Sequence, residues 1–152
     1  MQIHRGNLWE YHRRGHWVCV TTNGVVTGKG LLVMGKGVAL DAASRFPGLP
    51  LALGQKVRQE GNKLFLFPNE RIISFPTKHH WRDNSDLTLI RESTESLRMC
   101  WPIVSQVSTM NGVQPLPICL PKVGCGNGGL DWNAQVLPLL NGLLDDNYIA
   151  IL

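Results

Sequence analysis

One glycine-rich segment has the composition of an anion-binding turn. Residues 122–132 read Lys-Val-Gly-Cys-Gly-Asn-Gly-Gly-Leu-Asp-Trp, with four glycines among the six positions 124–129. Glycine lets the backbone approach a ligand closely, and free N–H groups at a helix start carry partial positive charge. An apolar run precedes the segment, and a helix-like pattern at 133–144 follows it. The spacing therefore predicts a turn that binds phosphate, and a diphosphate is the ligand we expect.

A second glycine turn, Met34-Gly35-Lys36-Gly37-Val38, also leads from an apolar run into a helix-like segment. In a parallel sheet, the loops that follow the carboxyl ends of neighbouring strands face one another. Two such turns would hold a diphosphate from both sides. The formal charge of +4 suits an anionic ligand or a nucleic acid and does not choose between them.

Two familiar nucleotide-binding patterns occur by letter, and each lacks a required part. Residues 30–36 read G-x-x-x-x-G-K, but Gly37 stands where a nucleotide triphosphatase needs Ser or Thr to hold Mg²⁺. The glycines of 124–129 match G-x-G-x-x-G, yet a dinucleotide fold also needs a strand ending in an acid about 20 residues later. The only strand left there, 148–152, has no acid at its end. Both classes are disfavoured.

The segment 77–83, Thr-Lys-His-His-Trp-Arg-Asp, begins where a predicted strand ends, at the same sheet edge as the glycine turns. Its basic side chains and the indole of Trp81 suit an anionic or sugar ligand. Cys125 could be a nucleophile at a helix start, but a small residue in a tight turn is the favoured interpretation. The histidines have no Cys or carboxylate at ligand spacing, so neither a metal nor a cofactor is predicted. Asn7 and Asn23 end strands, where an amide could bind a base or a ribose or simply make a turn.

Alternating apolar and helix-like segments predict the elements that position these residues. Strands are expected at 3–9 (broken at Gly6-Asn7), 17–22, 64–67, 72–75, 115–120 and 148–152, with a hairpin at 24–33. Helices are expected at 38–45, 51–59, 86–100 and 133–144, the third burying Leu87, Ile90 and Leu97. The pattern predicts an α/β fold with a three-layer α/β/α arrangement and a mixed, mainly parallel central sheet.

The totals fit one domain spanning residues 1–152. No apolar run approaches the roughly 20 residues of a membrane span, and the N-terminus does not read as a signal peptide. Four cysteines without paired spacing suit a reducing compartment. We therefore expect a monomer in the cytoplasm that does not contact a membrane.

Four blocks, in this order, resemble the macro domain, the ADP-ribose-binding fold. They are residues 6–9, 34–40, 75–82 and 124–132. The likeness spans nearly the whole chain. It is closest to the branch of DarG, the antitoxin that strips ADP-ribose from DNA, and to its relative, the terminal ADP-ribose protein glycohydrolase.

The resemblance implies an ADP-ribose site with roles for individual residues. Asn7 stands where the family usually has the Asp that binds the adenine amino group, Leu8 would offer its N–H to the adenine ring, and Asn23 falls near the distal ribose. The two glycine turns would bind the diphosphate. The implied site comprises Asn7, Leu8, Thr22, Asn23, Met34, Gly35, Lys36, Gly37, Val38, Lys78, Gly124, Cys125, Gly126, Asn127 and Gly128.

Lys78 matches the lysine to which this branch assigns catalysis. A lysine desolvated in a pocket can lose its proton and attack C1″ of the ribose, giving a Schiff base that water hydrolyses. The protein-directed relative has an Asp at the position of Gly128, which favours a DNA base over a protein as substrate here. The 24–33 hairpin is longer than the family's usual loop and could cover the distal ribose.

These features predict a hydrolase that removes ADP-ribose from a modified macromolecule, with nucleic acid as a possible partner. The alternative is a binder, sensor or sponge of ADP-ribose or a related NAD-derived nucleotide that does not turn it over. A third hypothesis, less favoured than these two, is a phosphatase that acts on ADP-ribose-1″-phosphate.

Overall fold

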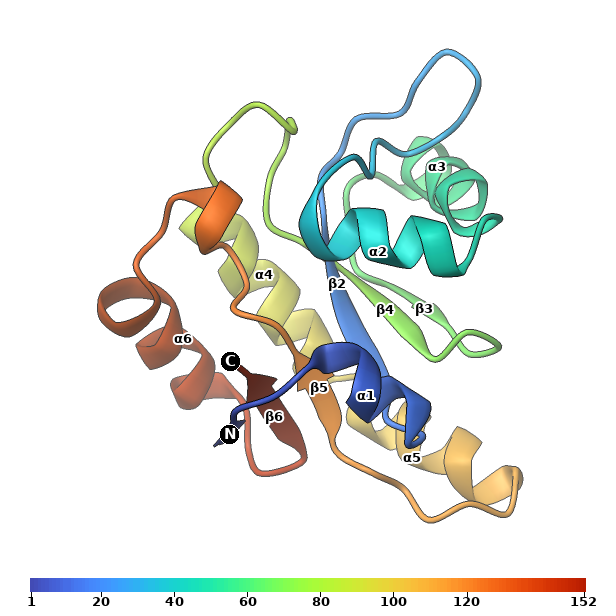
Figure 1. Cartoon of the computed structure of the whole chain (residues 1–152), viewed down its shortest axis with the longest axis vertical. Coiled ribbons are helices and arrows are strands. Elements are labelled where there is room, and N and C mark those ends of the chain that lie inside the picture. The colour runs from blue at the N-terminus through green and yellow to red at the C-terminus, as the bar shows by residue number, and fades with distance from the viewer.

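All residues, 1–152, are described by a computed structural model in which six strands form one sheet (Figure 1). The order across the sheet is β1-β6-β5-β2-β4-β3, and only β3 runs antiparallel to its neighbour. The strands are β1 Gln2–His4, β2 Val18–Thr22, β3 Phe65–Phe67, β4 Ile72–Pro76, β5 Ile118–Leu120 and β6 Tyr148–Ile151. The predicted mixed, mainly parallel sheet is confirmed.

Helices cover both faces of the sheet and complete three layers. One core cluster joins the sheet to α1, α2 and α3, and the other joins it to α4, α5 and α6. The helices are α1 Leu8–Arg13, α2 Gly37–Arg45, α3 Leu49–Glu60, α4 Leu87–Arg98, α5 Trp101–Met110 and α6 Leu137–Leu143, with a 3-10 turn η1 Gly126–Gly128 and a π-helical turn η2 Trp132–Val136. None of them is long and apolar enough to cross a membrane.

The strands are apolar on both faces because both faces are covered by helices. In β2, Val18 and Val20 pack on the α1–α3 side, while Cys19 packs on the α4–α6 side. The same alternation places Tyr148 and Ile149 of β6 in opposite clusters. A strand directs successive side chains to opposite faces, so each strand contributes to both cores.

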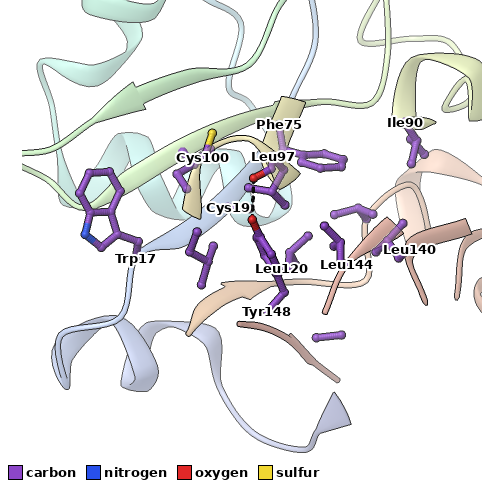
Figure 2. Close-up of a cluster of buried hydrophobic side chains, with 14 of the residues drawn as sticks. Trp17, Cys19, Phe75, Ile90, Leu97, Cys100, Leu120, Leu140, Leu144 and Tyr148 are labelled. Carbon is purple, nitrogen blue, oxygen red and sulfur yellow. Dashed lines mark hydrogen bonds between the residues drawn. The ribbon is translucent and has the colours of Figure 1, made fainter. Parts of the chain in front are cut away.

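Tyr148 brings a polar group into the α4–α6 core (Figure 2). Its hydroxyl donates to the backbone oxygen of Leu97 at 2.8 Å. Burial holds the pKa of this phenol well above its ordinary value. The bond occupies the hydroxyl and ties β6 to the end of α4.

The N-terminal prediction was only partly right. The strand ends at His4, and residues 8–13 form α1 instead of continuing extended. Asn7 begins this helix, because its Oδ1 accepts the N–H of Trp9 at 2.8 Å. An N-cap asparagine followed by apolar Leu8 and Trp9 is a helix-start signal that the strand interpretation overlooked.

The predicted hairpin at residues 24–33, here called the reversal loop, is not a pair of strands. The chain does turn back on itself, but only one antiparallel bridge forms, between Val26 and Leu32. The reversal loop packs against α3, where Leu32 N–H donates to the oxygen of Pro50 at 2.9 Å. Within the loop, Thr27 N–H donates to Leu31 O at 2.8 Å and Val33 N–H to Val25 O at 3.0 Å, so its backbone is held by these bonds and by α3.

The helix predicted at 86–100 is α4, and the sequence interpretation missed α5 after it. Asp86 caps α4 by accepting the N–H of Thr88 at 2.9 Å. Ile90 and Leu97 are buried as expected, whereas Leu87 is 36% exposed, so that part of the prediction was wrong. Pro102 interrupts the helical hydrogen bonding, and it is tolerated in the first turn of a new helix.

Candidate functional site

A cavity of about 820 Å³ lies where β2, β4 and β5 end. These three parallel strands direct their carboxyl ends to one edge, so the loops that follow them converge there. The residues that line it are Thr21, Thr22, Asn23, Val33, Gly35, Lys36, Gly37, Val38, Ala39, Thr77, Lys78, Trp81, Arg82, Ser85, Pro121, Lys122, Gly124, Cys125, Gly126, Asn127 and Gly128.

The first wall of the cavity is the N-terminus of α2. No side chain caps this helix, and its first paired amide is that of Leu40, which donates to Lys36 O at 3.2 Å. The N–H groups of Gly37, Val38 and Ala39 are therefore free, and all three residues line the cavity. A helix N-terminus with free donors attracts an anion through hydrogen bonds and through its partial positive charge.

The second wall is η1, which is built in the same way. Its N-terminus also has no side-chain cap, and the first amide to find a partner is that of Gly129, bonded to Gly126 O at 3.2 Å. The N–H groups of Gly126, Asn127 and Gly128 are left free beside the cavity. Gly126 has a φ of +71°, a conformation that glycine adopts at no steric cost.

The two walls face each other. A Cβ atom placed on Gly37 would lie 3.8 Å from Nδ2 of Asn127, the nearest neighbouring atom. Both sets of free N–H groups line the same cavity. Each set can donate hydrogen bonds to an anion such as a phosphate.

Lys78 brings its amine to the second wall. It follows β4, whose register with β2 continues one step further because Thr77 N–H donates to Thr22 O at 3.0 Å. Lys78 Nζ donates to the backbone oxygen of Asn127 at 3.1 Å and to that of Trp81 at 3.5 Å. The amine therefore reaches the second glycine turn from the opposite side of the cavity.

Asn23 lines the cavity, but its amide is also used within the protein. Nδ2 donates to Val33 O at 2.9 Å, and Oδ1 accepts the N–H of Val25 at 2.9 Å. These bonds close the base of the reversal loop. A role beside a ribose stays a prediction for this residue.

Three of the predicted site residues do not line the cavity. Asn7 uses its side-chain oxygen to cap α1, and Leu8 and Met34 are buried in the α1–α3 core. Their assigned part in binding the adenosine end of a ligand stays a prediction. The other twelve predicted residues all lie on the cavity wall.

Cys125 is not an activated thiol. Burial raises its pKa, and nearby Lys122 offsets this only in part. Its Sγ donates weakly to Val123 O at 3.6 Å. A thiol with a raised pKa is mostly protonated near neutral pH and is a poor nucleophile, which supports the interpretation of Cys125 as a small residue in a tight turn.

Ser85 was missed by the sequence interpretation, and it determines what position 128 can hold. A Cβ on Gly128 would overlap Ser85 Oγ and lie 3.0 Å from Ser85 Cβ. Ser85 N–H also donates to Gly128 O at 2.8 Å, and its buried hydroxyl has no partner. No side chain fits at position 128 while Ser85 stands there. A lone serine ahead of a helix has no sequence signal for this contact.

The rest of the 77–86 segment forms the rim. Trp81 is 42% exposed and stacks on His80 at a centroid distance of 5.2 Å, and the guanidinium of Arg82 lies 4.7 Å from the indole centre. His79 instead pairs with Asp86 at 2.8 Å, and this hydrogen bond lowers the pKa of that carboxyl. An aromatic ring and a cation thus border the cavity mouth.

Sequence comparison relates the chain to curated proteins, although no protein-family model matches it. A DNA ADP-ribosyl glycohydrolase of Mycobacterium tuberculosis is 32% identical over 110 residues, which are 66% of this chain and 28% of the relative. The Thermus aquaticus protein of the same name is 32% identical over 138 residues, or 84% of this chain and 33% of the relative. The chain thus spans about a third or less of the curated relatives it matches.

Solved structures give the same relationship. The macrodomain of Thermus aquaticus DarG superposes with a TM-score of 0.71 at 28% identity, covering 99% of this chain and 95% of that one. Thermosipho africanus DarTG, solved in complex with ADP-ribose, has a TM-score of 0.71 at 22% identity, covering 96% of this chain and 39% of that one, and supports the fold alone. On its fold and its sequence relationships, the chain is a macrodomain of the DarG type.

Proposed function

We propose that this macrodomain binds ADP-ribose and removes it from a modified macromolecule by attack of Lys78 at C1″ of the distal ribose. The observation that carries the proposal is the position of Lys78 Nζ, which stands in the cavity 3.1 Å from Asn127 O of the second glycine turn. An amine held beside a diphosphate site is placed to reach the sugar joined to that diphosphate.

The free amides of α2 and η1 support ADP-ribose as the ligand. Each set can donate to one phosphate, and together they suit a diphosphate linker. Lys36 and Lys122 line the same cavity and add positive charge. The matched relatives are DNA ADP-ribosyl glycohydrolases, and their name agrees with this ligand.

The attack would form a bond between Nζ and C1″ and release the base as the leaving group. Ring opening then gives a Schiff base, and water hydrolyses it to free ADP-ribose and the regenerated amine. The attacking amine must be neutral, because only an unprotonated nitrogen has a lone pair. A neutral amine still has two N–H groups, which can keep the bonds to the oxygens of Asn127 and Trp81 during the attack.

A DNA base is the substrate we favour over a protein side chain. The position that carries an Asp in the protein-directed relative is Gly128 here, and Ser85 leaves no room for a side chain. Trp81 and Arg82 at the rim offer a ring and a cation, which are groups that contact unpaired bases and phosphates.

The decisive experiment compares Lys78→Ala with the wild-type chain on an oligonucleotide carrying ADP-ribose on a base. We expect the wild type to release ADP-ribose and the variant to release none while still binding free ADP-ribose by calorimetry. Lys63→Ala is the matched control, because Lys63 is exposed and does not line the cavity. A Lys78→Ala variant that cleaves at the wild-type rate would refute the mechanism.

The alternative is a binder that does not turn ADP-ribose over. It is supported by the free amides of α2 and η1, which account for binding of a diphosphate without any reactive group. Tight ADP-ribose binding without release from modified DNA or protein would support this function.

A further inference from the structure

Asn62 contacts the backbone of the residue to which we assign catalysis. Its Nδ2 donates to the carbonyl oxygen of Lys78 at 2.9 Å, across 16 positions of sequence. Asn62 stands in the turn after α3, where Gly61 has a φ of +93° and its N–H bonds to Val57 O at 2.8 Å. The end of α3 therefore sets the point from which the amide reaches Lys78.

Gly24, at the start of the reversal loop, meets Asn62 and the segment after β4 at one point, here called the junction. Its N–H donates to His79 O at 3.1 Å. A Cβ on Gly24 would lie 3.0 Å from Asn62 Nδ2 and 3.1 Å from His79 O. The amide of Asn62 thus packs directly on the glycine backbone, and three segments distant in sequence meet beside Lys78.

The same helix holds the reversal loop elsewhere along its length. Leu32 N–H donates to Pro50 O at 2.9 Å in the first turn of α3. Gly54, in the middle of α3, has no room for a Cβ because the backbone oxygen of Gly30 fills that space. One helix therefore fixes both the loop beside the cavity and the amide that holds Lys78.

The other half of the Asn62 amide makes no hydrogen bond within the protein. Oδ1 is buried without a hydrogen-bond partner, and an unpaired buried acceptor costs free energy. Exchanging oxygen and nitrogen would set Oδ1 against the oxygen of Lys78, so the observed orientation is determined by that single bond. The bond to Lys78 O is therefore the one hydrogen bond that this side chain makes.

We propose that Asn62 is a positioning residue that fixes the backbone of Lys78 and thereby the place of its amine in the cavity. The inference rests on the proposed role of Lys78 as the nucleophile. A lysine side chain is long and flexible, so its origin must be held if Nζ is to meet C1″ in line. A displacement of about 1 Å at a reacting group can cost on the order of a hundredfold in rate.

The first test is Asn62→Asp, which keeps the size of the side chain and removes the N–H donor. We expect single-turnover release of ADP-ribose from a modified oligonucleotide to fall by about tenfold or more. The Kd for free ADP-ribose should stay within about threefold, because Asn62 does not line the cavity. Asn69→Asp, in the exposed turn after β3, introduces the same charge and should leave both quantities unchanged.

A second pair of variants tests the junction without changing charge or removing the amide. Gly24→Ala would push on Asn62 and on the carbonyl of His79, and we expect it to slow release without weakening ADP-ribose binding. Gly28→Ala lies in the same reversal loop with nothing within 4 Å of the added carbon, so it should behave as wild type. This pair decides the question if Asn62→Asp does not fold.

Rates and affinities separate the outcomes. Slower release at unchanged affinity supports a positioning role. Wild-type release by Asn62→Asp and Gly24→Ala, beside an inactive Lys78→Ala, would overturn that role and leave the glycohydrolase proposal standing. Equal losses of rate and affinity would also overturn it, since they indicate a general structural defect. If the wild-type chain releases no ADP-ribose, the proposed function fails and the role of Asn62 fails with it.

Discussion

Lys78 Nζ and the backbone oxygen of Asn127 lie 3.1 Å apart, although 49 positions separate the two residues. The bond joins the end of β4 to the second glycine turn across the cavity. It places a primary amine beside the free N–H groups of η1, where an anion would bind. Under the proposed function, η1 binds the diphosphate and Lys78 supplies the reactive group.

Gly126 lies in the second glycine turn, and Gly112, in the turn after α5, is its matched control. Their φ values are +71° and +72°, and neither has an atom within 4 Å of an added Cβ. Alanine at either position should cost about 1–2 kcal/mol of unfolding free energy through backbone strain. Only Gly126→Ala should also weaken ADP-ribose binding, by about tenfold, because it disturbs amides that face the cavity. Denaturant titration and calorimetry check both effects, and equal affinities in the two variants would contradict the assignment.

Ser85 and Ser93 should respond to alanine with opposite signs. Ser93 Oγ is buried and donates to Pro76 O at 2.7 Å, so Ser93→Ala should lower the unfolding free energy by about 1 kcal/mol. Ser85 Oγ is buried without a partner, and its removal should leave the ligand-free protein as stable or up to about 1 kcal/mol more stable. Chemical denaturation of the two variants measures this difference. A clear loss of stability in Ser85→Ala would mean that the hydroxyl does have a partner.

His12 should make the protein less stable below neutral pH. The ring is buried, its Nε2 donates to Glu70 O at 2.7 Å, and burial lowers its pKa below the ordinary value of 6.5. The unfolded chain therefore binds a proton more readily, so stability falls as pH drops through 6.5 and continues to fall until the folded pKa is reached. Nearby Arg71 and Arg45 act in the same direction.

Unfolding free energies measured between pH 8 and about pH 5 test this expectation. This range is chosen because histidines titrate within it. In His12→Gln the decline should be smaller, because residue 12 no longer titrates. An identical decline in both proteins would show that another group causes it.

Arg82 should separate binding of the nucleotide from contact with nucleic acid. Its guanidinium lies 4.7 Å from the Trp81 ring centre at the cavity rim. If it contacts a phosphate of DNA, Arg82→Ala should weaken binding to an ADP-ribosylated oligonucleotide more than binding to free ADP-ribose. The slope of log K against log salt should fall by about one. Arg91→Ala, on the exposed side of α4, is the control. Equal effects on the two ligands would argue against a nucleic-acid contact at Arg82.

Local patterns in the sequence were enough to predict most of the sheet and both glycine turns. Segments such as 17–22 and 72–75 are short, apolar and β-branched, and they form strands as predicted because their conformation depends mainly on their own residues. The glycines of 34–38 and 124–129 precede helical segments, and their spacing alone indicated anion-binding turns. Boundaries were less certain where a polar residue changes the local structure, as Asn7 does by capping α1.

The reversal loop and α5 show where local patterns were insufficient. Apolar residues at 24–33 predicted a hairpin, and the chain does reverse there, but it forms a single bridge and packs on α3 instead of extending into two strands. Residues 101–110 carry no charge and no strong helical signal, and the proline at 102 obscured a new helix start. In both cases tertiary packing outweighed a weak local preference.

By itself the sequence determined which groups this protein can use: two glycine turns, a lysine after a buried strand, and a glycine at position 128. Only the tertiary structure decided how these groups meet. The contacts of Ser85 with Gly128 and of Asn62 with Lys78 join residues 43 and 16 positions apart, and no spacing rule predicts them. The physical reason is that one sheet edge brings together loops from distant strands, so their mutual contacts depend on the packing of whole helices.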